Sequence, residues 1–163
     1  MSIMPKAGTA TPSDGLARQV SRLEVLGNLV GRASIPLMRA SLGVVFIWFG
    51  ALKLSNASPV GELVAKTVPF LPANVFVPAL GIFEMLLGLG LLIGRRLEIV
   101  ALLMVAHLSG TFLVLVTQPS VAFQHGNPLM LTMTGEFVVK NIVLISAGLV
   151  LATLRPQQQA TPR

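Results

Sequence analysis

The sequence contains no cysteine among its 163 residues. For the chain acting alone, this absence excludes disulfides, thiol–disulfide exchange, iron–sulfur clusters and zinc–thiolate sites. Charge is also scarce, since only 11% of the residues are Asp, Glu, Lys or Arg, about half the share of a soluble domain. So few charges cannot cover a water-facing surface. With 53% hydrophobic residues, the chain is expected to be surrounded by lipid.

Most enzyme signatures are absent as well. The sequence has no glycine-rich phosphate loop, no nucleophile elbow and no His-Glu metal motif. Its two histidines, His107 and His125, make a poor haem pair, because one falls in the middle of an apolar run and the other in a loop. No metal, haem, flavin or iron–sulfur site is therefore predicted. Whether the chain is an enzyme stays open.

Four long apolar segments fill about half of the chain. They run over residues 35–54, 75–94, 97–117 and 137–154. Each has roughly 18–21 residues, which at 1.5 Å per residue spans a hydrocarbon core of about 30 Å. One such segment could be a buried helix of a soluble protein, but four leave little room for that reading. The sequence predicts an all-α integral membrane protein, a four-helix bundle over residues 34–154.

The flanking segments are polar. Residues 1–33 are expected to form a partly disordered cytoplasmic segment, with a weak signal for a short interfacial helix at 20–29. The first apolar run follows this segment and is too long for the core of a signal peptide, so it is expected to be a retained anchor. Residues 155–163 are expected to form a short cytoplasmic tail.

The connections between the apolar segments differ in character. The turn Gly94–Arg96 is so short that the second and third helices must form an antiparallel hairpin. The first connection, 55–74, contains an amphipathic stretch at 60–68 that predicts a short helix on the membrane surface. In the last connection, Thr134 is expected to cap the fourth helix, with Glu136 in its first turn.

The basic residues predict the orientation. With the N-terminus in the cytoplasm, nine of the 12 Lys and Arg residues lie on the cytoplasmic side, as the positive-inside rule requires. An even number of spans then places the C-terminus inside as well, as in a bacterial inner-membrane protein. The basic residues form no patch with interleaved aromatics, so nucleic acid is not expected as a partner. The nine basic residues expected on the cytoplasmic side are Lys6, Arg18, Arg22, Arg32, Arg39, Arg95, Arg96, Arg155 and Arg163.

Ionisable side chains inside a bilayer are costly, so each one is a candidate functional residue. In the first helix Arg39, Gly43, Phe46, Gly50 and Lys53 are spaced four, three, four and three residues apart. This spacing puts them on one face. The two glycines allow a neighbouring helix to approach, so the charged residues are expected to point into the bundle. The alternative is that both charged side chains reach the two opposite interfaces.

Glu84 and His107 are expected at one depth. Glu84 lies 11 residues before Arg95, and His107 lies 11 residues after Arg96. In an antiparallel hairpin these separations allow a contact between them. Glu84 is then either protonated or paired with a buried cation, and a histidine is suited to moving protons near neutral pH. The alternative for His107 is a neutral ring bonded to a helix carbonyl or a threonine hydroxyl.

The fourth helix begins with Glu136, Lys140 and Asn141. We expect Lys140 and Glu136 to line the outer half of the bundle with Lys53, above Glu84. A local ion pair between Glu136 and Lys140 is the rival explanation, because Glu followed by Lys at i+4 is the favourable order on a helix.

Parts of these helices resemble the DoxX-like membrane proteins, nearest to the branch with the reactive-chlorine-resistance inner-membrane protein. The first helix carries the runs Met38–Gly43 and Trp48–Leu54. Gly81–Gly94, with its acidic residue and repeated glycines, is similar to the second helix of the group, and Gly135–Asn141 to its fourth-helix motif. The resemblance covers residues 34–154.

The resemblance implies a four-helix membrane bundle, in a group with subunits of quinone-linked sulfur oxidation and proteins of oxidative-stress resistance. The loop between the first two helices is shorter here than in some relatives, so no loop function is carried over. His107 joins the candidate site from its depth alone. The positions that match the group's polar residues are Arg39, Lys53, Glu84, Glu136, Lys140 and Asn141.

The leading hypothesis is a membrane subunit or stress-protection protein whose buried polar residues hold a quinone or another small polar ligand. Electrons would come from a redox partner subunit, since no redox cofactor site is visible. One alternative is a transporter or proton-conducting bundle that uses the same residues as a relay. A third hypothesis is a membrane scaffold without chemistry of its own, in which the polar residues only fix the register of the helices. The expected partners are the lipid bilayer and either that redox subunit or a second copy of the chain.

Overall fold

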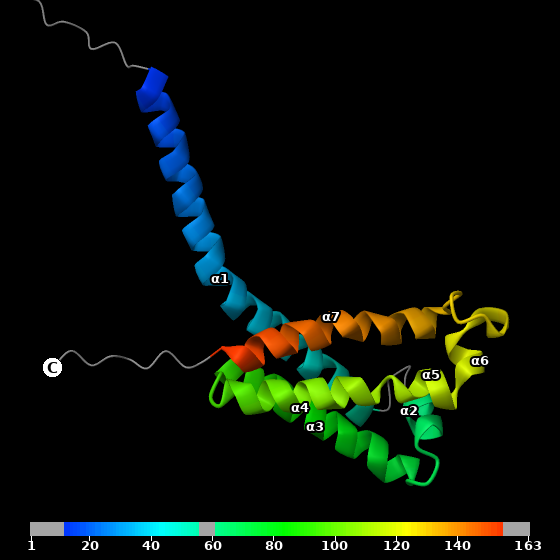
Figure 1. Ribbon diagram of the computed structural model, residues 1–163. Coiled ribbons are helices and arrows are strands. Elements are labelled where there is room, and N and C mark those ends of the chain that lie inside the picture. The colour runs from blue at the N-terminus through cyan, green and yellow to red at the C-terminus, as the bar shows by residue number, and fades with distance from the viewer. Residues whose placement is uncertain (1–11, 56–60, 155–163) are drawn as a thin grey trace, which may run out of the picture. The chain divides into compact units, whose positions relative to one another are not determined.

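The computed structural model describes residues 12–55 and 61–154. Within these ranges the chain is α-helical and has no β-strand, only an isolated bridge between Phe123 and Leu131. Figure 1 shows the helices in chain order. They are α1 Pro12–Leu54, α2 Gly61–Thr67, α3 Ala73–Ile93, α4 Leu97–Gly110, α5 Leu113–Thr117, α6 Pro119–Ala122, the 3-10 helix η1 Gln124–Gly126 and α7 Met133–Thr153.

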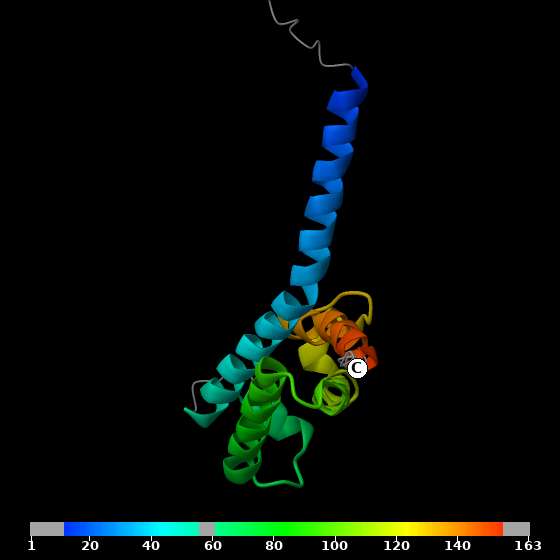
Figure 2. The same cartoon turned by 90° about the vertical axis from the view of Figure 1, so that its left-hand side faces the viewer.

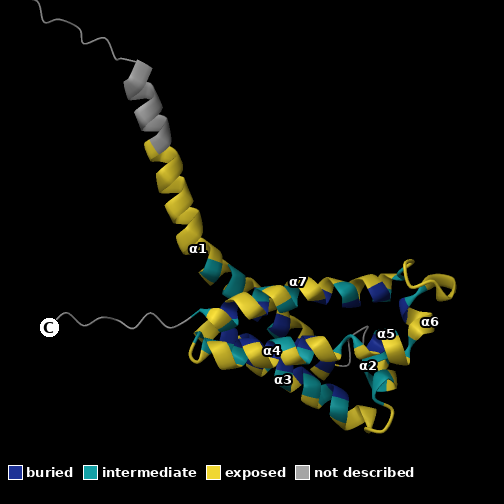
Figure 3. Ribbon diagram, in the orientation of Figure 1, coloured by how far each residue is buried: buried dark blue, intermediate teal, exposed yellow. Residues whose placement is uncertain are grey.

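Four segments are long and apolar enough to cross a membrane, so the predicted all-α membrane fold is confirmed. In the most apolar 18-residue stretch of each span, only 22–28% of the residues are buried against the rest of the chain. Most side chains of the spans are therefore left to face lipid. In Figure 3 the buried positions lie where helices face one another. The spans are Ser21–Leu54, Ala73–Ile93, Leu97–Thr117 and Met133–Thr153, α4 and α5 together forming the third.

The first helix is longer than predicted. It begins at Pro12 and has 43 residues, whereas the apolar run begins only near Ile35. High hydropathy marks the part that can enter lipid, but a helix also forms in the less apolar stretch before it, where no proline follows Pro12 until Pro36. Residues 1–11 and 155–163 lie outside the described residues.

The chain divides into two compact units, residues 1–37 and 38–163. In the first unit, the side chains from Ser21 onward are exposed, apart from a partly buried Ile35. The second unit contains the bundle formed by the remainder of α1 with α3, α4 and α7. All the candidate site residues belong to the second unit.

Helices α1 and α3 pack closely through two pairs of glycines. A Cβ atom on Gly50 would lie 2.5 Å from the carbonyl oxygen of Gly81. Likewise, a Cβ atom on Gly88 would lie 2.6 Å from the carbonyl oxygen of Gly43. The glycines are seven residues apart on both helices, so the two pairs meet together when the helices run antiparallel. Small residues are the usual means of bringing backbones together in a membrane.

Helix α4 packs against both α3 and α7. The predicted hairpin between α3 and α4 is present: Gly94 ends α3 with a φ of 74°, and Arg96 precedes α4 with a φ of 50°. In both views α7 runs alongside α4 (Figure 1 and Figure 2). Gly148 of α7 faces the side chain of Met104. We call the end of the bundle at Gly94–Arg96 the turn end.

The opposite end, which we call the loop end, carries the short helices. The predicted amphipathic helix in the first connection is present as α2. Gln118 donates hydrogen bonds to the Leu63 carbonyl (3.0 Å) and to the Thr67 hydroxyl (2.8 Å), which ties α2 to the third span.

The N-cap of α7 is Thr132, not Thr134 as predicted. Its hydroxyl accepts a hydrogen bond from the backbone N–H of Gly135 at 3.1 Å, and its own backbone is extended (φ −78°, ψ 173°). Thr132 also donates to the Val121 carbonyl at 2.5 Å. This contact with the preceding loop, which the sequence does not reveal, favours the earlier start. Glu136 lies in the first turn, as expected.

Candidate functional site

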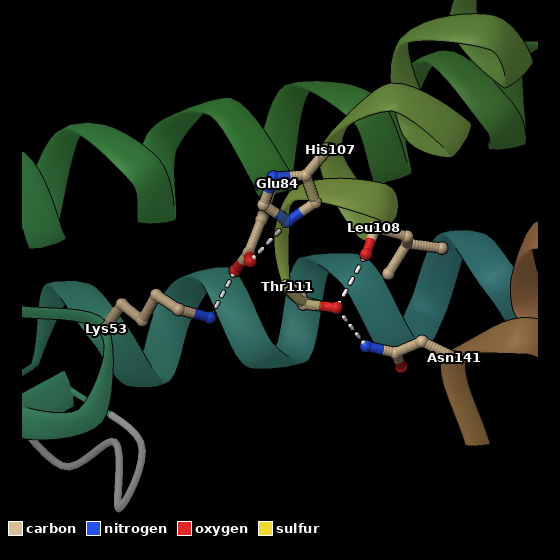
Figure 4. A network of polar contacts seen from close by, with 6 residues as sticks. All are labelled: Lys53, Glu84, His107, Leu108, Thr111 and Asn141. Carbon is tan, nitrogen blue, oxygen red and sulfur yellow. Dashed lines mark hydrogen bonds and ion pairs between the residues drawn. The ribbon is translucent and has the colours of Figure 1, made fainter. Parts of the chain in front are cut away.

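The centre of the candidate site is an ion pair between two membrane spans. The Lys53 Nζ of α1 lies 2.6 Å from Oε2 of Glu84 on α3, and the two side chains are only 6% and 8% exposed. Figure 4 shows the lysine extended toward the carboxylate. The long stem of Lys53 packs against Gly81, where a Cβ atom would lie 3.0 Å from the lysine Cβ. The glycine therefore makes room for the lysine to reach Glu84.

The direction of helical side chains favours this pairing. Side chains in an α-helix lean toward its N-terminus. Lys53 lies in the last turn of α1 and leans back toward the middle of the bundle. Glu84 lies in the middle of α3 and leans toward the loop end. Because the helices are antiparallel, the two charged groups approach each other.

His107 of α4 binds the other carboxylate oxygen. Its Nε2 lies 2.9 Å from Oε1 of Glu84, and its side chain is 11% exposed. The rings of Phe46 and Phe83 meet the imidazole edge to face, with centroids at 6.1 and 5.7 Å. An ionised carboxylate only accepts hydrogen bonds, so next to the lysine Glu84 takes a hydrogen bond from Nε2–H. The ring nitrogen Nδ1 then remains for a further contact.

These three side chains form one polar network, the Lys53–Glu84–His107 network, which joins three spans. The separation of Glu84 and His107 from the Gly94–Arg96 turn brings them to one depth, about 15 Å from the turn at 1.5 Å per residue. On the loop-end side the buried residues include the polar Asn141 beside apolar ones such as Val114 and Val138. On the turn-end side the buried side chains of the bundle are apolar: Leu42, Phe46, Leu87, Leu91, Ala101, Met104 and Leu151.

A second polar contact joins the third and fourth spans. Asn141, which is 7% exposed, donates from Nδ2 to the Thr111 hydroxyl at 2.8 Å. That hydroxyl donates to the Leu108 carbonyl at 2.6 Å, as Figure 4 shows. Sequence reasoning included Asn141 but not Thr111 as its partner. The signal that could have found it is Gly110 followed by a threonine inside a span.

The third span changes its backbone at this point. Between Leu108 and Leu115 the N–H groups of Thr111, Phe112, Val114 and Leu115 bond to carbonyls three residues earlier. This 3-10 stretch separates α4 from α5. Such a stretch inside a helix often marks a functional position, and here it directly follows His107.

Lys140 and Glu136 lie outside the polar network, which corrects the expectation that they join Lys53. Their charged atoms are 3.4 Å apart, and their side chains are 74% and 56% exposed. The reason is the helical repeat: Asn141 faces the interior, so its neighbour Lys140 is turned by about 100°. Glu136, one turn earlier, shares that outer face. The local i,i+4 pair, the rival explanation, is the arrangement found.

Arg39 also lies apart from the network, at the turn end. It donates from Nε to the Leu91 carbonyl (3.1 Å) and from Nη2 to the Leu92 carbonyl (3.2 Å). These are among the last carbonyls of α3, which lack partners within the helix. A positive charge there also stabilises the helix dipole. Arg39 thus caps α3.

The described residues contain no group of three His, Cys, Asp or Glu side chains that could hold a metal ion. Comparison with protein families found that a model of the DoxX family matches residues 35–117. This range is 83 of the 163 residues and includes the whole polar network. The comparisons with curated proteins and with solved structures found no match.

Proposed function

The chain belongs to the DoxX family of membrane proteins, and we propose that its polar network binds a quinone or a similar small polar ligand. The protein would be a multi-pass subunit of the bacterial inner membrane that serves redox chemistry or oxidative-stress resistance. The observation that carries this proposal is the burial of Lys53, Glu84 and His107 together within the membrane spans. A charge in hydrocarbon is costly and usually marks a functional position.

The donors of the network match the acceptors of a quinone. Lys53 has three N–H groups, of which one is bonded to Glu84, and a further N–H can be donated to a quinone carbonyl oxygen. His107 binds Glu84 through Nε2, which leaves Nδ1 for proton exchange with a ligand. The flanking rings of Phe46 and Phe83 provide an apolar, aromatic setting that suits a lipid-soluble ring.

Reduction of a quinone to a quinol consumes two electrons and two protons. The electrons would come from a redox partner subunit. Protons would pass to the quinone oxygens through His107 and Glu84, and Lys53 would stabilise negative charge on the nearer oxygen as electrons arrive. In this scheme the chain supplies binding and proton transfer, and the partner supplies the reducing equivalents.

The one-sided polarity of the bundle supports ligand binding over transmembrane conduction. A proton relay across the membrane needs exchangeable groups on both sides of Glu84. The described buried positions between the network and the turn end are apolar, Leu87, Leu91 and Met104 among them. Polar groups such as Gln118 and Thr111 lie on the loop-end side. A ligand exchanging protons with the loop-end side fits this distribution.

The test is retention of a quinone by the purified protein. The protein would be extracted with its native lipid into nanodiscs, and bound small molecules would be quantified by mass spectrometry. In Glu84→Gln and Lys53→Met the affinity for the quinone, measured by its retention, should fall roughly 10- to 150-fold, as expected for the loss of a charge-assisted hydrogen bond of about 1.5–3 kcal/mol. Lys140→Met, whose side chain is exposed, is the matched control and should retain it.

Two results would overturn the proposal. One is wild-type protein that carries no quinone above an empty nanodisc. The other is equal retention in the network variants and the control. Proton flux into liposomes in the absence of a quinone would instead support the conducting alternative. Growth under hypochlorite, measured for the same variants in a deletion strain, tests the role in oxidative-stress resistance.

A further inference from the structure

The segment of α1 from Ser21 to Ser34 has side chains that suit a membrane surface. Its large apolar residues are more than half exposed: Leu23 at 68%, Val30 at 67%, and Leu29, Leu26 and Val25 at 55–57%. The span itself needs only about 20 residues to cross the hydrocarbon, so these residues are surplus to the crossing. About four further helical turns with water-exposed Leu and Val side chains would be unfavourable.

These side chains are arranged in two arcs. At 100° per residue, the five large apolar side chains fall within an arc of about 160°. The polar and small residues Ser21, Glu24, Asn28 and Arg32 fall in the opposite arc. Arg22 lies within the apolar arc at the start of the segment, where its long side chain can extend toward water.

The width of the apolar arc indicates which partner covers it. A second copy of the chain, paired as a coiled coil, needs only the narrow stripe of two positions in seven. Here the apolar side chains cover nearly half of the helix surface, as in helices that lie in a membrane interface. The segment belongs to the same helix as the part that enters the bilayer, which holds it near the lipid. Pro36 lies between the two parts, and a proline inside a helix removes a backbone hydrogen bond and allows the helix to bend there.

We infer that residues 21–34 bind the surface of the bilayer, with the apolar arc in the acyl boundary and the polar arc toward water. The occupant of this surface is lipid. With two arginines and one glutamate in the segment, apolar burial drives the binding and anionic headgroups add a smaller contribution. This interaction is independent of the ligand proposed for the polar network.

The absence of native cysteine allows a direct test on the full-length protein. Single-cysteine variants Leu26→Cys and Asn28→Cys would be spin-labelled and placed in nanodiscs of phosphatidylcholine and phosphatidylglycerol. A label at Leu26 should be accessible to oxygen and shielded from a water-soluble nickel chelate, and a label at Asn28 should show the reverse. Val44→Cys, exposed within the span, gives the lipid-facing reference.

Two outcomes would overturn the inference. Equal access of the nickel chelate to both labels would mean that the segment projects into water. Dipolar broadening between labels at Leu26 would show a second copy on the apolar arc. Because the substitutions are at exposed positions of a helix, unfolding is not expected. Far-UV circular dichroism of each labelled variant, compared with the wild type, checks that its helix content is kept.

Discussion

Because Lys53 and Glu84 are paired, the cost of burying the charge of either residue depends on the presence of the other. A lone charge in the interior is more costly than a satisfied pair, so removing one partner should be worse than removing both. Glu84→Gln alone should lower the stability of the detergent-solubilised protein by the order of 3 kcal/mol. Adding Lys53→Met should restore part of that loss. The measurement is a thermal-unfolding double-mutant cycle.

The control for this cycle is Glu136→Gln with Lys140→Met. Both side chains are exposed in an i,i+4 pair, a type of pair worth about 0.3–0.5 kcal/mol, so each change should have little effect. If the losses at Glu84 and Lys53 simply add, the two residues are not coupled and the network is not a unit. If stability is unchanged but the quinone is lost, the pair serves binding more than folding.

At this scale the sequence predicted some contacts and not others. The common depth of Glu84 and His107 follows from counting residues on both sides of a tight turn, and the structure has that contact at 2.9 Å. Lys140 could not be assigned in the same way. Its sequence spacing fits both an interior position and a local pair, and only the rotation of α7 about its axis decides between them. That rotation depends on packing against α4, where Asn141 faces inward.

At the scale of elements, the close packing of α1 against α3 requires glycine, which has no Cβ atom, where the two backbones approach each other. Gly50→Ala would bring a Cβ within 2.5 Å of the Gly81 carbonyl oxygen. The backbones must then separate, and we expect a loss of about 1–3 kcal/mol, as for overpacked cores. Folded yield and thermal unfolding in detergent measure it.

The matched control is Gly110→Ala, because no atom lies within 4 Å of a Cβ built there. Gly126 is a poor control, since its φ of 72° strains any other residue. Equal tolerance at Gly50 and Gly110 would show that α1 and α3 do not pack through their glycines.

Element boundaries were harder to predict than the elements themselves. Hydropathy located the four spans because lipid requires long apolar runs. It did not locate the start of α1, since the first part of that helix is only amphipathic. Thr132 rather than Thr134 is the N-cap of α7, because its hydroxyl also binds the Val121 carbonyl, a contact between parts of the chain that a local motif does not contain.

At the scale of the whole molecule, the proposed topology places both termini and the turn end in the cytoplasm. A reporter inserted after Arg95 should therefore read as cytoplasmic, and one inserted after Gln124 should read as external. The physical reason is the excess of basic residues on the cytoplasmic side. An external reading after Arg95 would contradict the arrangement, and the proton exchange of the polar network would then face the opposite compartment.

The glycine pairs and the ion pair of α1 and α3 together have a consequence for biogenesis. A charged side chain within a span raises the cost of insertion, by up to about 2.5–3.5 kcal/mol at the helix centre. Lys53 and Glu84 belong to the first two spans to leave the ribosome, so their charges can pair before His107 emerges from it. The glycines let these two spans close against each other without help from α4 or α7. The chain can thus enter the bilayer as a hairpin in which Lys53 and Glu84 are already paired, and the later spans need only dock onto it.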